Sequence, residues 1–141
     1  MFFDNTDQLL DKLRFNQIEG DDYWSCEGLY FELFFTAGEE GPTEAQLESY
    51  LDFQENSIEF VDKIKAKVID QLEREKGSAP KRYYSDIPMV EIVNINAPLD
   101  KHSMDIVISF CTFRLLFYRR WKTWVAKFNG RNLVSVEISS R

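Results

Sequence analysis

The chain has 141 residues, of which 44 % are hydrophobic and 15 % aromatic, and its formal net charge is −7. This length suits one domain with its own core, and the apolar content excludes intrinsic disorder. The two cysteines, Cys26 and Cys111, lie far apart and form no CxxC pair. This pattern favours buried thiols in a reducing compartment over a disulfide framework. We therefore expect a single soluble domain over residues 1–141.

No apolar run approaches the length of a membrane span, and the N-terminus has an early acid but no apolar signal-peptide core. We expect a cytoplasmic protein without a membrane span.

The first part of the chain predicts a strand preceded by an ambiguous segment. Over about 9–18, Thr6 could cap a short helix, or Leu13 and its neighbours could belong to a first strand. Gly20-Asp21-Asp22 predicts a turn. Residues 29–36 are rich in strand-forming side chains on both faces, which indicates a strand inside its sheet.

A capping box predicts where the first long helix begins. The Thr43 hydroxyl can accept from the backbone N–H of Gln46, while the Gln46 side chain reaches back to the N–H of Thr43. The helix should run from about 44 to 53.

A second helix over 57–76 follows, with Asn56 as its candidate cap and Glu59 three residues later. Gly77 suits the position just after its last turn. Its apolar residues recur every three or four positions and should form one buried stripe: Ile58, Val61, Ile64, Val68 and Leu72. The two helices together predict a helical hairpin.

The C-terminal third is rich in β-branched residues and predicts strands at 87–95, 104–111, 121–128 and 133–138. Asn129-Gly130 is a strong hairpin signal between the last two. In the last strand, alternation places Val134, Val136 and Ile138 on one face. The order of elements predicts an α+β fold: a mainly antiparallel sheet, with the helical hairpin inserted between N-terminal strands and a C-terminal strand meander.

Residues 112–128 also fit a different structure. Their aromatic residues recur at helical spacing between basic residues, so the segment could be a basic amphipathic helix. The turn directly after it and its aromatic, β-branched composition favour strands. The conflict is sharpest over 112–120.

The sequence contains no recognisable catalytic apparatus. His102 is its single histidine and lies in a polar connection, which excludes a metal centre that needs two imidazoles. No nucleophile motif or phosphate-binding glycine loop is present. We expect no catalytic residue, metal or cofactor, although an enzyme with an unrecognised carboxylate site stays as an alternative.

Charge is divided unevenly along the chain. Residues 1–80 hold 7 Lys/Arg and 19 Asp/Glu, whereas residues 81–141 hold 10 and 5. Such a split predicts either a polarised surface that steers partners or two halves that pack against each other. In the first case the acids Asp21, Asp22, Glu39 and Glu40 would form a contact surface.

The segment 114–131 interleaves basic and aromatic residues. Arg119, Arg120, Trp121 and Trp124 have the composition of an interface hot spot, while the competing interpretation places the aromatics in the core. Such a segment could also bind nucleic acid or a membrane surface. The pI of about 4.8 makes a nucleic-acid partner an unfavoured alternative.

The order of several features resembles small bacterial α+β domains, some of them similar to the immunity proteins of contact-dependent and polymorphic toxin systems. The features are Trp24, Pro42-Thr43 with Gln46, the stripe of the second helix, and the final hairpin from Trp124 to Gly130. The resemblance implies a non-catalytic protein that neutralises a toxin. An acidic inhibitor suits a basic toxin, because opposite charge speeds association. The aromatic content is also compatible with a homodimer.

Overall fold

The computed structural model describes residues 6–18, 21–26, 30–77, 84–97, 105–115 and 119–139. Their strands form one mixed sheet in the order β1-β2-β3-β4-β5-β6-β7. The strands are β1 (Leu13–Ile18), β2 (Asp21–Cys26), β3 (Glu32–Thr36), β4 (Met89–Ile95), β5 (Ile106–Arg114), β6 (Arg119–Asn129) and β7 (Asn132–Ile138). The helices are α1 (Thr6–Lys12), α2 (Glu44–Glu55) and α3 (Ser57–Lys76).

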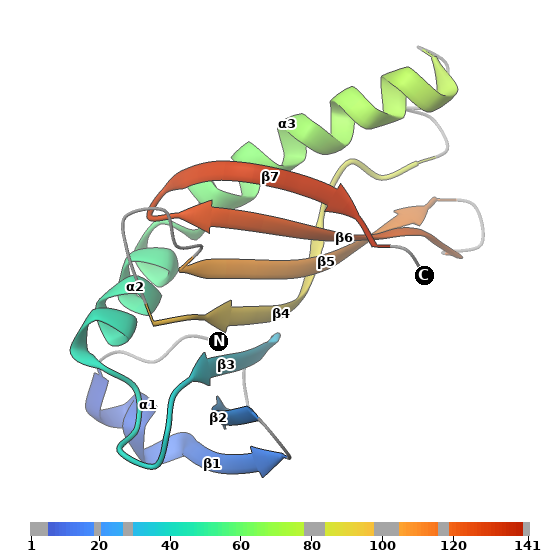
Figure 1. Cartoon of the computed structure of the whole chain (residues 1–141). Helices are drawn as coiled ribbons and strands as arrows, with labels where there is room; N and C mark the ends of the chain where they lie inside the picture. Colours follow the sequence, from blue (N-terminus) through green and yellow to red (C-terminus); the bar gives the residue numbers. More distant parts are fainter. Residues whose placement is uncertain are drawn as a thin grey trace.

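Neighbouring strands are antiparallel except β3 and β4, which are parallel. A parallel pair requires a crossover connection, and α2 and α3 supply it between these two strands. Figure 1 shows both helices on one side of the sheet, with the meander β4–β7 continuing beyond β3. The predicted α+β fold is confirmed.

The N-terminal segment contains both structures that the sequence left open. α1 ends at Lys12 and β1 begins at once at Leu13. The turn predicted at Gly20-Asp21-Asp22 is wrong for its aspartates, because the ladder pairs Asp21 with Ile18 and so places them within β2. Gly20 lies outside the described residues. Pairing with β1 outweighs the low strand propensity of aspartate.

The strand predicted at 29–36 is shorter, since β3 covers Glu32–Thr36, but it does lie between two other strands. Leu33 and Phe35 are fully buried beneath the helices. Phe34 points to the opposite face and is only half-buried.

The predicted capping box starts α2. The Thr43 hydroxyl accepts from the backbone N–H of Gln46 at 3.2 Å, and the side-chain Oε1 of Gln46 accepts from the backbone N–H of Thr43 at 2.9 Å. α3 ends at Lys76 as predicted, and Gly77 then adopts a φ of +75° that favours glycine.

Asn56 occupies the N-cap position of α3 as predicted, and its carbonyl accepts from the Phe60 N–H at 3.2 Å. Its side chain makes no capping bond to α3 and instead donates to the backbone and side-chain oxygens of Asp52, both at 3.0 Å. Because Asn56 alone separates the two helices, its side chain closes the end of α2 while its carbonyl opens α3.

The apolar stripe of α3 is correct except at its start. Ile64, Val68 and Leu72 are buried, but Ile58 is 77 % exposed, and Phe60 takes the inward position. The two residues from Ile58 to Phe60 turn the helix by about 200°, so both cannot face the core. Phe60 packs on Phe128, with ring centroids 4.8 Å apart.

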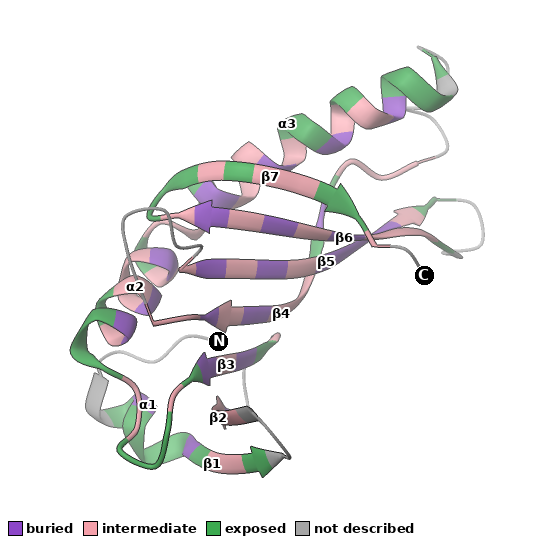
Figure 2. Cartoon of the chain, in the orientation of Figure 1, coloured by how far each residue is buried: buried purple, intermediate pink, exposed green. Residues whose placement is uncertain are grey.

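The segment that fitted both helix and strand is strand on both sides of the turn at Leu115. β5 continues to Arg114 and β6 begins at Arg119, so the amphipathic helix is wrong there; residues 116–118 lie outside the described part. Figure 2 shows alternating burial along β5 and β6, and Ile106, Ile108 and Phe110 are buried. Cross-strand pairing decides the structure where periodicity is ambiguous.

The alternation predicted for the last strand is wrong because β7 contains a bulge. Lys127 pairs with Ser135 and Phe128 with Leu133, so Val134 is an extra residue and is 51 % exposed. Leu133 and Val136 pack on the core instead. The hairpin predicted at Asn129-Gly130 is confirmed, with Gly130 at a φ of +60°.

Candidate interaction surfaces

Cations of the C-terminal half bind acids of the helices and of β4. In the turn between β6 and β7, the Arg131 Nη2 lies 2.6 Å from the Asp52 Oδ1 of α2, and its Nε donates to the Oδ2 at 3.0 Å. Three further pairs join the same parts of the fold: Arg131 with Glu59 at 3.5 Å, Lys122 with Glu75 at 3.1 Å, and Arg120 with Glu91 at 2.5 Å. Arg131 and Lys122 therefore join the C-terminal half to the helices, whereas Arg120 and Glu91 pair within that half.

The same pairs reduce the positive charge that the segment 114–131 presents to solvent. Arg120, Lys122 and Arg131 each lie against a carboxylate, and Arg114 lies 6.0 Å over the ring of Tyr84. A phosphate backbone is held by cations that are free to neutralise it. Lys127 of this segment stays outside these pairs, so fewer free cations face solvent than the sequence suggests.

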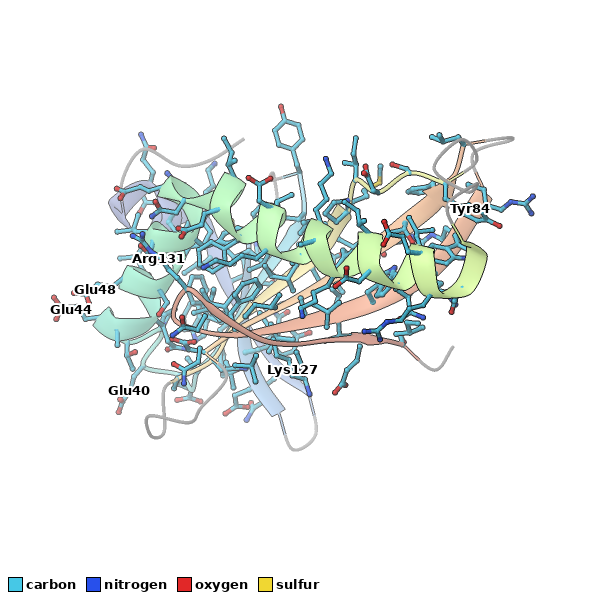
Figure 3. All side chains as sticks on the ribbon, turned by 90° about the horizontal axis from the view of Figure 1, so that it is seen from above. Glu40, Glu44, Glu48, Tyr84, Lys127 and Arg131 are labelled. Atoms are coloured by element: carbon cyan, nitrogen blue, oxygen red, sulfur yellow. The ribbon has the colours of Figure 1, made fainter. Side chains whose placement is uncertain are left out.

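Several acids gather at one end of the sheet, where Arg131 of the β6–β7 turn is held by Asp52 and Glu59 (Figure 3). We call this surface the acidic end; it consists of Asp22, Glu39, Glu40, Glu44 and Glu48, and no ion pair forms at any of them within the described part of the chain. Figure 3 shows Glu40, Glu44 and Glu48 pointing away from the body of the protein, at the end opposite Tyr84.

Three local features bring these acids together. The turn with Glu39 and Glu40 directly follows β3, and the pairing of Tyr23 with Thr36 places Asp22 at the same end of the sheet. The Trp24 Nε1 donates to the carbonyl of Gly38 at 2.7 Å, which ties β2 to the turn. Asp21 also begins β2 here, but its side chain is not described.

Gln46 fixes the start of α2 at this end. Although polar, it is fully buried, and its Nε2 donates to the carbonyls of Thr36 at 2.8 Å and Ile95 at 3.1 Å. These are the last residues of the parallel strands β3 and β4. Gln46 therefore holds the helix that carries Glu44 and Glu48 against the sheet.

The predicted basic–aromatic contact residues do not form one exposed set: Arg119, Arg120 and Trp121 begin β6 at the opposite end, whereas Trp124 lies in the middle of the strand. Trp124 is 2 % exposed, stacks on Phe110 and donates from Nε1 to the Thr112 hydroxyl at 2.9 Å. As a partner contact Trp124 is wrong, because its ring belongs to the core. Trp121 is half-buried beside Tyr84.

The arginines predicted with them have different surroundings. Arg120 is exposed and paired with Glu91. Arg119 pairs through its backbone with Arg114, and its side chain is not described.

The sheet face that carries no helix was not predicted as a surface. It holds a shallow groove of about 820 Å³, with half-buried Phe34, Ile92 and Val125 along its floor. Two large side chains on the groove are well exposed, Tyr30 at 87 % and Met89 at 55 %. Alternating apolar residues were visible in the sequence, but only the placement of the helices shows which face stays open.

Cys26 lines this groove, and Cys111 lies on β5 beside it in surroundings that make its thiol unreactive. Cys111 is buried and free, and it pairs with Met89 and Thr123 of the groove. Burial, followed by the Glu91 carboxylate, raises the pKa of the thiol, while Arg120 opposes them. Since the thiolate is the nucleophile, the thiol is poorly suited to covalent catalysis at neutral pH.

Within the described residues, no three His, Cys, Asp or Glu side chains gather in a way that could hold a metal ion. His102 lies outside the described residues. No helix in the described part of the chain has the length and apolarity needed to cross a membrane.

Tyr50 of α2 has a buried hydroxyl with no hydrogen-bond partner among the described residues. Burial raises the pKa of its phenol well above the ordinary value. Since an unsatisfied buried polar group destabilises the folded state, Tyr50→Phe should raise the free energy of unfolding by about 1 kcal/mol. Urea denaturation measures it, and a loss of 1 kcal/mol or more would show that the hydroxyl has a stabilising partner.

Comparison with known proteins adds no relative to this description: no protein-family model, curated protein or solved structure matches the chain.

Proposed function

We propose that this chain is a non-catalytic protein-binding module whose acidic end contacts a basic partner, in the manner of a toxin-neutralising immunity protein. One observation carries the proposal. Arg120, Lys122 and Arg131 of the C-terminal half are paired internally, whereas Asp22, Glu39, Glu40, Glu44 and Glu48 form no ion pair among the described residues at one end of the fold.

Like charges repel one another at the acidic end, even though Glu44 is itself favoured by its place in the first turn of α2. Glu44 and Glu48 are both exposed and four residues apart on α2, and like charges at this spacing destabilise a helix by about 0.2–0.5 kcal/mol. A basic partner would remove this repulsion on binding. Clustered charge of one sign also steers an oppositely charged protein and raises its association rate.

The chemistry of a partner follows from its charge. An enzyme that attacks nucleic acid must carry cations to hold phosphate, and an acidic surface can cover those cations. The resemblance of the capping box, the helix stripe and the final hairpin to immunity proteins supports the same class. The two buried cysteines, Cys26 and Cys111, fit a protein that acts in the cytoplasm.

Affinity capture from the organism that carries the gene tests the proposal with a matched pair of double variants. Glu44→Gln with Glu48→Gln removes two charges from the acidic end; Asp62→Asn with Asp70→Asn removes two exposed charges from α3. The wild-type protein and the α3 variant should retain a basic protein in stoichiometric amount. The acidic-end variant should lose at least about tenfold in affinity, because it lacks the charges that complement the partner.

Two results would contradict the proposal. One is the absence of any stoichiometric protein partner. The other is a partner that both double variants weaken equally, because net charge rather than the acidic end would then explain the binding.

A further inference from the structure

The helix-free face of the sheet is less polar than an exposed face should be. An antiparallel sheet with one solvated face normally alternates apolar residues toward the core with polar residues toward water. Here Phe34, Ile92 and Val125 occupy the open side of three interior strands, and Tyr30 and Met89 stand exposed beside them. An apolar centre on a surface indicates that another surface covers it.

The charges of this face do not suit the basic partner proposed for the acidic end. Glu32 and Glu91 are the charged residues lining the groove, and Arg120 neutralises Glu91. The groove lies toward the start of β3 and β4, whereas the acidic end follows the last residues of these strands. This face is nearly neutral on a protein with a net charge of −7. A molecule that docks on it lies away from the acidic end.

The polar groups of the face match a copy of themselves. Ser25, Thr123 and Ser139 line the groove beside the apolar floor, and Ser109 lies within the floor, paired with Ile92 and Val125. A hydroxyl both donates and accepts hydrogen bonds, so a face that carries hydroxyls can pair with its own copy. A two-fold interface requires this property, since the same patch lies on both subunits. A face lined by unpaired charges of one sign would repel its own copy.

We propose that the helix-free face is the interface of a homodimer, in which two copies pack sheet against sheet through the groove around Ile92. Packed sheets place their inner faces about 10 Å apart with interdigitating side chains. The whole face measures about 29 Å across its strands and about 20 Å along them. Because side chains make the surface uneven, the accessible area of this face approaches the roughly 800 Å² that each partner buries in a standard interface.

Sedimentation analysis of the full chain over a range of concentrations tests the dimer. The wild-type protein should have twice the 16.7 kDa mass of one chain. Ile92→Lys and Met89→Lys should each weaken dimerisation at least about 100-fold, because a symmetric interface carries every substitution twice. Ile58→Lys is the matched control, since Ile58 is 77 % exposed on α3, and it should leave the dimer intact.

Circular dichroism shows which variants are folded, and only folded variants are used to judge the dimer. If Ile92→Lys fails to fold, Met89→Lys carries the test, because Met89 is already 55 % exposed. A wild-type protein that stays at 16.7 kDa at several hundred micromolar overturns the proposal, as does a dimer that survives both substitutions. The variant with Gln at Glu44 and Glu48 should remain dimeric, so failure of the dimer is distinguishable from failure of the acidic end.

Discussion

Trp124→Ala should lower the free energy of unfolding by about 3–5 kcal/mol, the range for large aromatic-to-alanine changes in a core. The ring is 2 % exposed and lies between Phe110, whose ring is parallel to it, and Trp121. Removing it leaves a cavity at the centre of the sheet and also leaves the buried Thr112 hydroxyl without its donor. Urea denaturation followed by circular dichroism measures the loss.

Two further variants separate packing from hydrogen bonding at this site. Trp124→Phe should cost less than the alanine change, because it keeps a ring against Phe110. Thr112→Val should cost about 1–3 kcal/mol, since it leaves the buried Trp124 N–H unpaired. A loss below 1 kcal/mol for Trp124→Ala would contradict the core position of Trp124 and return it to the candidate contact residues.

Gln46→Ala should lower the free energy of unfolding by about 3 kcal/mol. Loss of the bond from the Thr43 N–H to the Gln46 side-chain oxygen costs about 1 kcal/mol, whereas the backbone N–H of residue 46 still donates to the Thr43 hydroxyl. The carbonyls of Thr36 and Ile95 would also lose their donor, and each unsatisfied buried group costs about 1–3 kcal/mol, less whatever the site recovers by relaxing. Urea denaturation gives the difference.

Gln71→Ala is the matched control for this change. Gln71 lies on α3, where its amide donates to Glu75 on the exposed side of the helix. Surface substitutions of this kind usually change stability by less than about 0.5 kcal/mol. Equal losses from both alanine variants would show that Gln46 does not join α2 to the ends of β3 and β4.

Local signals in the sequence predicted the elements whose structure depends on neighbouring residues. The capping box at Thr43, the glycine at Gly77 and the turn at Asn129-Gly130 are confirmed, because each satisfies its own backbone groups nearby. The errors arise from tertiary contacts. Ile58 has an apolar side chain in helical phase with its neighbours, and only the position of the sheet shows that Phe60 faces the core.

The candidate interaction surface was likewise predictable only where it depends on the local sequence. The sequence revealed the surplus of acids in the first half of the chain, and Glu39 and Glu40 do lie in an exposed turn. It could not reveal which acids remain unpaired, because Asp52 meets Arg131 across 79 residues of sequence. It also could not separate Trp124 from Trp121, since burial of either ring depends on which side of β6 the helices cover.

The acidic end is the central claim, and the association rate of the captured partner tests it most directly. Stopped-flow measurement across ionic strengths should show the rate falling steeply with salt for the wild-type protein and for the variant with Asn at Asp62 and Asp70. The double variant Glu44→Gln with Glu48→Gln should associate more slowly at low salt, and its association rate should depend less on salt. The reason is that electrostatic steering comes from these charges and weakens as salt screens them. Identical salt dependence in all three proteins would contradict the claim.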